Sequence, residues 1–312
     1  MNAIVFPGQG SQIVGMGLEF YNNFEIVKKI FKEADDKLNY KISEIILKGP
    51  EDKLKLTQNT QPAILTISYA IFSVLKKEFN FDFSSTKFFA GHSLGEYSAL
   101  VCSESLNFKD ALFLLYERGK SMQEAVPIGK GSMLAVLGSK LNEIEKLIQK
   151  SNLKGVCEIA NDNAEGQTII SGDVESINSF KKILKDNKIK SIPLNVSAPF
   201  HCSLMRPAAL KMEDKINSVS FKKPIFDIIC NVTSRPENNP ESIKKLLIDQ
   251  ISSTVRWRES IINMSKENIT NFIEIGPGKI LTGMIKRTVK NINCFSINSI
   301  DDMKKTINEF KK

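Results

Sequence analysis

The chain has 312 residues, of which 42% are hydrophobic, which is enough for one large core with a smaller domain attached. The formal net charge is +8, but the lysines are spread evenly and no basic run alternates with aromatic residues. We therefore expect no nucleic-acid partner and only a mild preference for acidic partners. No stretch approaches the roughly 18 apolar residues of a membrane span, and no signal-peptide pattern begins the chain. We expect a cytoplasmic protein without membrane contact.

The cysteines are scattered, without a Cys-x-x-Cys pair or the spacing of a zinc site. Thiols arranged in this way are typical of a reducing compartment. We therefore expect free thiols, no disulfide, no metal and no bound cofactor. The five cysteines are Cys102, Cys157, Cys202, Cys230 and Cys294.

Strands and helices alternate through residues 1–127. This alternation predicts a mostly parallel sheet in an α/β domain. The apolar periodicity, with glycine and proline as stop signals, sets the expected bounds. The expected elements are a strand at 3–6, one helix over 20–38, a helix over 61–79, a strand at 87–90, and helices over 96–104 and 110–122.

The pattern changes between residues 128 and 197. There the order is strand, helix, strand, strand, helix, strand, and this βαββαβ order is that of a ferredoxin-like domain. Since the α/β alternation resumes afterwards, we expect a small domain inserted between two parts of a large one, 1–127 and 198–312. The expected elements of the insert are strands at 133–137, 156–160, 168–171 and 189–196, with helices over 141–150 and 175–185. Those that follow are a helix after 207, strands at 225–230 and 272–275, and helices over 241–251 and 258–265.

A candidate nucleophile lies in Gly91-His92-Ser93-Leu94-Gly95, between an expected strand and an expected helix. Glycines at this spacing permit a strained turn that lifts the Ser93 hydroxyl clear of the backbone, as in a nucleophile elbow. The amide of Leu94, at the helix N-terminus, would then point to a developing oxyanion. An ordinary glycine-rich turn is the alternative, and the flanking elements favour the elbow.

A nucleophilic serine needs a base, and the sequence contains only two histidines, His92 and His201. His92 adjoins Ser93, and adjacent residues on a tight turn usually point apart. His201 lies in the loop that leaves the last strand of the small domain, where the two domains would face each other. We predict that His201 is the general base, the alternative being a packed or surface histidine.

The first loop, Gly8-Gln9-Gly10-Ser11-Gln12, follows a strand as a dinucleotide-binding loop would. It is not such a loop, because position 13 is Ile13 rather than the third glycine, and it has no Walker lysine. Its free amides are suited to supply the second donor of an oxyanion hole. A simple turn between strand and helix is an equal alternative.

Arg118 lies on an apolar stripe of the expected helix over 110–122. A buried guanidinium needs an anion. That anion is either a ligand or an internal carboxylate, and the sequence leaves both open. The other members of the stripe are Ala111, Leu114, Leu115 and Met122.

Six short motifs run nearly end to end along the chain. They are Phe-Pro-Gly-Gln-Gly-Ser-Gln at 6–12, Thr-Gln-Pro-Ala at 60–63, Gly-His-Ser-Leu-Gly-Glu-Tyr at 91–97, Arg-Gly-Lys at 118–120, Phe-His-Cys at 200–202 and Glu-Ile-Gly-Pro-Gly-Lys at 274–279. Together they resemble the malonyl-CoA:acyl carrier protein transacylases of fatty-acid synthesis. That family also includes acyltransferase domains of polyketide and fatty-acid megasynthases.

The resemblance implies a hydrolase-like domain with a ferredoxin-like insert and a ping-pong reaction. Malonyl would pass from malonyl-CoA to Ser93, and then to the phosphopantetheine thiol of acyl carrier protein. His201 would shuttle the proton, and the backbone amides of Gln9 and Leu94 would hold the oxyanion. Arg118 would bind the malonyl carboxylate.

The resemblance also assigns residues around this machinery. The backbone carbonyl of Gln250 would orient His201, and Asn161 would line the pocket. We expect His92, beside the nucleophile, to contact substrate as well. Phe200 would narrow the pocket and disfavour an α-methyl branch, which favours malonyl over methylmalonyl.

Two other functions are compatible with parts of this pattern. A serine thioesterase or lipase would share the elbow and the base, but it would orient His201 with an acid such as Asp249 and has no use for Arg118 in its acyl pocket. A non-catalytic scaffold would be expected to lose Ser93 or His201, and both are present.

Overall fold

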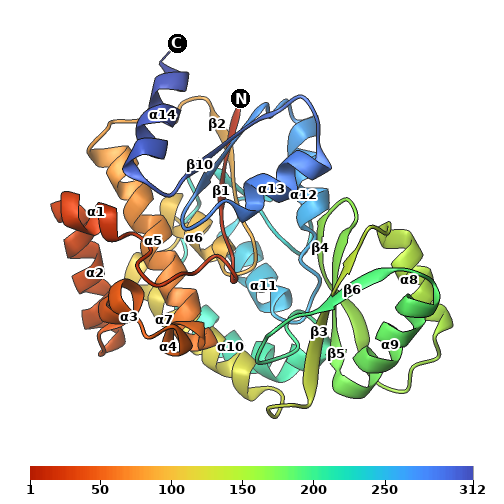
Figure 1. Ribbon diagram of the computed structural model, residues 1–312. Coiled ribbons are helices and arrows are strands. Elements are labelled where there is room, and N and C mark those ends of the chain that lie inside the picture. Colours follow the sequence, from red (N-terminus) through yellow and green to blue (C-terminus); the bar gives the residue numbers. More distant parts are fainter. Residues whose placement is uncertain (312) are drawn as a thin grey trace.

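Two β-sheets organise the chain, a mostly parallel one and a smaller antiparallel one (Figure 1). This computed structural model describes residues 1–311. The larger sheet has the order β10-β9-β1-β2-β7-β8, in which β8 runs antiparallel to β7 and the other neighbours pair parallel. Its strands are β1 (Asn2–Phe6), β2 (Thr86–Gly91), β7 (Asp227–Ile229), β8 (Pro236–Glu237), β9 (Asn271–Ile275) and β10 (Asn293–Ile297).

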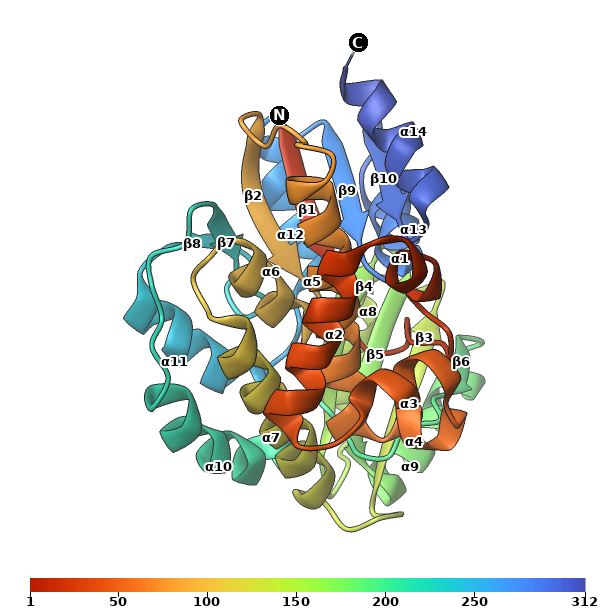
Figure 2. The ribbon, with the colours of Figure 1, turned by 90° about the vertical axis from the view of Figure 1, so that its left-hand side faces the viewer.

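Helices cover both faces of this sheet, as a parallel sheet requires. Alternate residues of β1 face the two layers: Ile4 and Phe6 join the larger core, whereas Ala3 and Val5 join the smaller one. The smaller core packs against α12 (Trp257–Lys266) and α13 (Ile280–Thr288). The larger layer, which faces the viewer in Figure 2, contains α1 (Leu18–Asn23), α2 (Glu25–Leu38), α3 (Ile42–Lys48), α4 (Glu51–Lys55), α5 (Thr57–Lys77), α6 (Gly95–Cys102), α7 (Phe108–Glu124), the 3₁₀ turn η1 (Ser203–Met205), α10 (Arg206–Asn217), α11 (Pro240–Gln250) and α14 (Ile300–Phe310).

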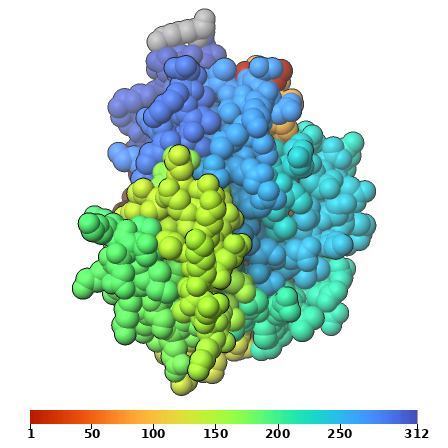
Figure 3. Space-filling model, turned by 90° about the vertical axis from the view of Figure 1, so that its right-hand side faces the viewer, coloured from red at the N-terminus to blue at the C-terminus, as the bar shows by residue number. Residues whose placement is uncertain are grey.

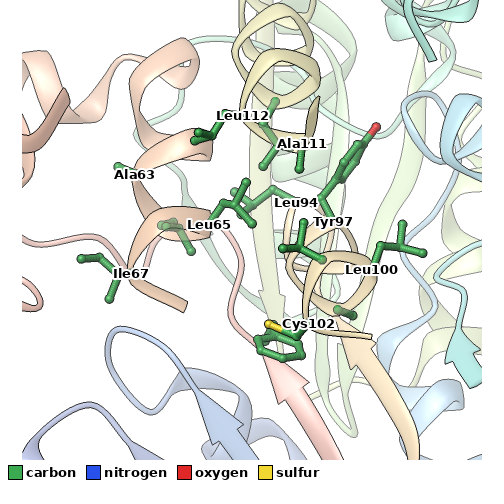
Figure 4. Close-up of a cluster of buried hydrophobic side chains, with 14 of the residues drawn as sticks. Ala63, Leu65, Ile67, Leu94, Tyr97, Leu100, Cys102, Ala111 and Leu112 are labelled. Carbon is green, nitrogen blue, oxygen red and sulfur yellow. The ribbon is translucent and has the colours of Figure 1, made fainter. Parts of the chain in front are cut away.

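The centre of the larger layer is the contact between α5, α6 and α7. Figure 4 shows Leu65, Leu94 and Ala111 pointing toward one another from the start or body of these helices. All three side chains are at most 1% exposed. Because α6 begins two residues after Ser93, the packing of its first turn against α5 and α7 fixes the position of the elbow.

The elbow itself connects β2 to α6. Ser93 has φ 53°, the left-handed region that a non-glycine residue rarely adopts. The flanking glycines make this turn possible by close approach: a Cβ on Gly91 would lie 1.9 Å from the carbonyl carbon of Gly95, and one on Gly95 would lie 2.3 Å from the Phe6 carbonyl oxygen. The turn predicted from the glycine spacing is therefore present.

The smaller sheet has the antiparallel order β4-β5-β3-β6. With one helix after β3 and one after β5, this is the ferredoxin-like arrangement that the sequence predicts. It has its own core, which includes Leu134 and Phe180, and in Figure 3 it forms the yellow-green to green lobe beside the blue segments. The domain boundaries at 128 and 197 stay a prediction. The elements are β3 (Gly131–Leu137), α8 (Leu141–Lys150), β4 (Cys157–Ala164), β5 (Gln167–Asp173), α9 (Val174–Asp186) and β6 (Lys190–Pro193).

Two expected elements are wrong in extent, and several elements of the structure were not expected. The single helix expected over 20–38 is broken, because Phe24 is extended (φ −129°, ψ 121°) and caps α2. The strand expected over 189–196 ends at Pro193, and the residues after it turn away to line a cavity. The elements that were not expected from the sequence are α3, α4, η1, β8, α13, β10 and α14.

We predict that Gly91→Ala destabilises the protein by about 3 kcal/mol or more, since its Cβ would meet backbone that cannot move independently. Gly283→Ala is the matched control, because Gly283 lies within α13 with nothing within 4 Å of an added Cβ. There the change should stabilise by about 0.5–1 kcal/mol. Urea unfolding of both variants measures the difference; equal stabilities would contradict the close approach at the elbow.

Candidate active site

Ser93 and His201 meet across 108 residues of sequence. The Ser93 Oγ lies 2.8 Å from the His201 Nε2. Both residues are nearly buried, at 9% and 5% exposed, and both have positive φ, 53° and 57°. The elbow raises the hydroxyl, and the loop between β6 and η1 brings the imidazole to it. This is the contact that a serine nucleophile and its base require.

A backbone carbonyl orients the imidazole. The His201 Nδ1 lies 2.9 Å from the carbonyl oxygen of Gln250. Since a carbonyl only accepts, this contact assigns the proton to Nδ1 and leaves Nε2 as an acceptor for the Ser93 hydroxyl. The neighbouring carboxylate of Asp249 makes no hydrogen bond to His201 within residues 1–311. The geometry therefore matches the neutral of the two orienting groups considered from sequence.

Burial, followed by the charge of Arg118, lowers the pKa of His201 to about 3. The imidazole is thus neutral at physiological pH, the state in which it accepts a proton. Burial also lowers the pKa of His92, whose Nε2 lies 2.8 Å from the Asn163 Oδ1. Within residues 1–311 its ring makes no hydrogen bond to Ser93 or His201, and it packs edge-on against Trp257.

Arg118 lies beside the nucleophile and is 1% exposed. Its Nη1 donates to the Gln61 Oε1 at 2.8 Å, and its Nη2 donates to the Gln250 Oε1 at 2.8 Å and to the Ser93 Oγ at 3.1 Å. The guanidinium carbon also lies 5.9 Å from the centre of the Tyr97 ring. All these acceptors are neutral.

No carboxylate of residues 1–311 forms an ion pair with Arg118, and its Nε has no hydrogen-bond partner there. An internal carboxylate, one of the two anions that the sequence left open, is thus not in contact with it. Burial lowers the pKa of the Arg118 guanidinium, which nevertheless stays charged because arginine is not deprotonated in proteins. A buried cation without a counter-ion is a site for an anionic ligand.

These groups share one cavity of about 330 Å³. The cavity lies between the elbow, the first loop, the small sheet and α13. It brings together most of the residues predicted from sequence, while the side chain of Leu94 instead belongs to the core. The predicted residues that line it are Gln9, His92, Ser93, Arg118, Asn161, Phe200 and His201.

The first loop lies against the elbow. A Cβ on Gly8 would lie 2.5 Å from the His92 carbonyl oxygen, so the two backbones touch and Gln9 lies beside Ser93. No acceptor within residues 1–311 pairs with the amide of Gln9 or of Leu94. Two free amides beside a nucleophile are the donors of an oxyanion hole. That assignment stays a prediction, which this arrangement supports.

Three polar residues around the nucleophile had no role in the sequence analysis. Gln61 accepts a hydrogen bond from Arg118, and the available signal was its place in the Thr-Gln-Pro-Ala motif at 60–63. Asn231 contacts the Ser93 amide at 2.7 Å, and it directly follows a buried strand at the carboxyl edge of the sheet, where functional residues gather. Glu96 contacts Gln250 at 2.9 Å, and burial raises its pKa to about 7.

Residues 3–312 match the family model described as acyl transferase domain. The chain belongs to this family. A malonyl CoA-acyl carrier protein transacylase of Bacillus subtilis (strain 168) is 39% identical over 312 residues, which cover 99% of this chain and 97% of the relative. The corresponding protein of Haemophilus influenzae is 38% identical over 96% of this chain and 95% of its own length. The family resemblance drawn from the motifs is confirmed.

Solved structures of other acyl transferase domains have the same fold. An acyl-carrier-protein-S-malonyltransferase from Bartonella henselae superposes with a TM-score of 0.96 and 38% identity, covering 100% of this chain and 99% of that one. A malonyl-transacylase in complex with a type II PKS acyl-carrier protein gives 0.95 and 36%, over 99% of both chains. No helix in residues 1–311 has the length and apolarity to cross a membrane.

We predict that the reactivity of Ser93 stays level between about pH 5 and 8 as far as His201 is concerned. A base with a lowered pKa is lost only as the pH falls through about 3, rather than through the ordinary 6.5. The rate of modification by phenylmethanesulfonyl fluoride measures this in wild type and in Glu96→Gln. The substitution removes Glu96, a nearby buried acid whose own pKa of about 7 would otherwise add an inflection. An inflection near pH 6.5 that persists in Glu96→Gln would contradict the prediction.

Proposed function

We propose that this acyl transferase transfers a malonyl group from malonyl-CoA to the phosphopantetheine thiol of acyl carrier protein, and so supplies fatty-acid synthesis. The observation that carries the proposal is the buried, unpaired Arg118 in the same cavity as Ser93 and His201. Relatives that share almost the full length are named for this reaction, and one is a complex with its acyl-carrier protein.

The first half of the reaction acylates the serine. His201 accepts the Ser93 proton at Nε2 as Oγ attacks the thioester carbonyl, and it returns that proton to the departing thiol of coenzyme A. The amides of Gln9 and Leu94 stabilise the oxyanion of the tetrahedral intermediate. In the second half, His201 deprotonates the phosphopantetheine thiol, whose sulfur attacks the acyl carbonyl. The ester bond to Ser93 then breaks, and His201 returns the proton to the Ser93 Oγ.

Arg118 selects the acyl group in this proposal. Its Nη2 already lies 3.1 Å from the Ser93 Oγ, and the malonyl carboxylate is separated from the thioester carbonyl by a single methylene. A carboxylate at that separation reaches the guanidinium when the carbonyl reaches Oγ. The planar fork of arginine binds a carboxylate through two parallel hydrogen bonds, which a neutral acyl group cannot form.

The remaining predicted residues shape the cavity. Asn161 and His92 line it and offer polar contacts to the acyl or pantetheine chain, and Phe200 restricts the space beside His201. These roles support malonyl over an α-branched acyl group. The free thiols of all five cysteines are in keeping with the cytoplasmic location that we propose.

A serine thioesterase is the alternative that shares Ser93 and His201. Against it stands the group that orients the imidazole, a neutral carbonyl of Gln250 at 2.9 Å rather than an acid. A hydrolase would also have to retain a buried cation beside its nucleophile without an ion pair, although its acyl substrates carry no matching charge. Transfer of an anionic acyl group accounts for both features.

We predict that malonyl-CoA alone leaves a malonyl ester on Ser93, because a ping-pong enzyme accumulates its acyl intermediate until the second thiol arrives. Intact-protein mass spectrometry detects the adduct, and peptide mapping locates it. Ser93→Ala should abolish it, whereas Ser98→Ala, at a buried serine of α6 outside the cavity, should not. An adduct on Cys202, or none in wild type, would refute the mechanism.

We predict that Arg118→Ala lowers kcat/KM for malonyl-CoA by about 30- to 5,000-fold, the range for removing one partner of a desolvated ion pair. Acetyl-CoA has no carboxylate, so its slow transfer should stay level or rise. Arg118→Lys keeps the charge but loses the fork, and an intermediate loss for malonyl alone is expected. Equal losses for both thioesters would show that Arg118 supports the fold rather than the substrate.

A further inference from the structure

The carboxamide of Asn231 spans the nucleophile turn from behind. Its Oδ1 accepts from the Ser93 amide at 2.7 Å, and its Nδ2 donates to the Gly91 carbonyl at 2.7 Å. One side chain thus holds the backbone on both sides of His92. Asn231 is fully buried and does not line the cavity, so its bonds serve the turn and not a ligand.

Glu96 fixes Asn231 in turn. The Glu96 Oε2 accepts from the backbone N–H of Asn231 at 2.9 Å and from the side-chain Nε2 of Gln250 at 2.9 Å. Because the same carboxamide nitrogen also donates to the Ser93 carbonyl at 3.1 Å, the oxygen of Gln250 is left to hold Arg118. The Glu96 carboxylate therefore connects Asn231, which holds the backbone of the elbow, to Gln250, which holds the guanidinium of Arg118.

The bond to Asn231 decides which amide of the turn stays free. The amides of His92, Gly95 and Glu96 donate to the carbonyls of Phe6, His92 and Ser93. The Ser93 amide donates to Asn231. Within residues 92–96 of the described chain, this leaves the amide of Leu94 without an acceptor, which is the state an oxyanion donor needs.

We propose that Asn231, anchored by Glu96, is a positioning residue that holds the hydroxyl of Ser93 in its attacking position and keeps the amide of Leu94 as the one free donor of the turn. A left-handed non-glycine backbone persists only where its surroundings over-determine it. Asn231 supplies that constraint from a segment 138 residues away. The inference rests on the proposed function only for its serine chemistry, not for the identity of the acyl group.

The experiment measures the nucleophile without any acyl substrate. Phenylmethanesulfonyl fluoride modifies an active-site serine with loss of fluoride, and the rate reports how well the hydroxyl and its base are aligned. Asn231→Ala should react about 100-fold more slowly than wild type, the effect of a small misplacement of a reacting group. Asn231→Ser, whose hydroxyl is too short to bridge both backbone groups, should be nearly as slow.

Two further variants isolate the cause. Asn263→Ala is the matched control. It removes a carboxamide of α12 that donates to the Ser234 carbonyl at 3.0 Å, three residues beyond Asn231 and away from the elbow, so this variant should react at the wild-type rate. Glu96→Gln retains an oxygen that accepts from Asn231, so it should react faster than Glu96→Leu, which does not.

Steady-state transfer separates positioning from substrate binding. In Asn231→Ser, kcat for malonyl-CoA and acetyl-CoA should fall by the same factor, with KM unchanged, because Arg118 is intact. Thermal unfolding shows which variants are folded. A folded Asn231→Ala or Asn231→Ser that is modified at the wild-type rate overturns the inference. Absence of malonyl transfer in the wild type would refute the proposed function. The rate of Ser93 modification by phenylmethanesulfonyl fluoride would still test the role of Asn231.

Discussion

The strained turn between β2 and α6 is the constraint on which the rest of the site depends. Ser93 is held at φ 53°, and the two glycines beside it let three backbone segments approach closely enough to support it. Because the parallel sheet places the ends of β1, β2 and β7 together, the first loop, the elbow and Asn231 meet at one edge. The fold therefore brings the predicted nucleophile, Asn231 and the expected oxyanion donors together at neighbouring strand ends.

The charge states of the site depend on the separation of Glu96 from Arg118. Glu96 and Arg118 are both buried, yet the carboxamide of Gln250 separates them. Its nitrogen donates to Glu96, and its oxygen accepts from Arg118. Desolvation raises the pKa of Glu96 to about 7 and lowers the pKa of the neighbouring His201 to about 3. Since no acid of residues 1–311 contacts it directly, the guanidinium keeps an unneutralised positive charge toward the cavity, and the imidazole stays neutral beside it.

Much of this site follows from sequence, and what does not has a physical reason. The glycine spacing locates Ser93, and the scarcity of histidines leaves His201 as the base that a serine needs. By contrast, Gln61 and Asn231 contact their partners across 57 and 138 residues, and hydrogen bonds of that range have no local pattern. The break of the first helix at Phe24 has no local pattern either. The helical spacing of apolar residues continues through Phe24, although its backbone is extended.

A single neutral residue links the two features that favour transfer of an anionic acyl group. Gln250 presents its backbone carbonyl to the His201 Nδ1 and its side-chain oxygen to the Arg118 Nη2. An aspartate or glutamate orienting the imidazole from this position, as in a charged triad, would also give Arg118 an internal counter-ion. The substrate carboxylate would then have to displace that ion pair. Orienting the imidazole with an uncharged group leaves the guanidinium available, which is what the proposed transfer of an anionic acyl group requires.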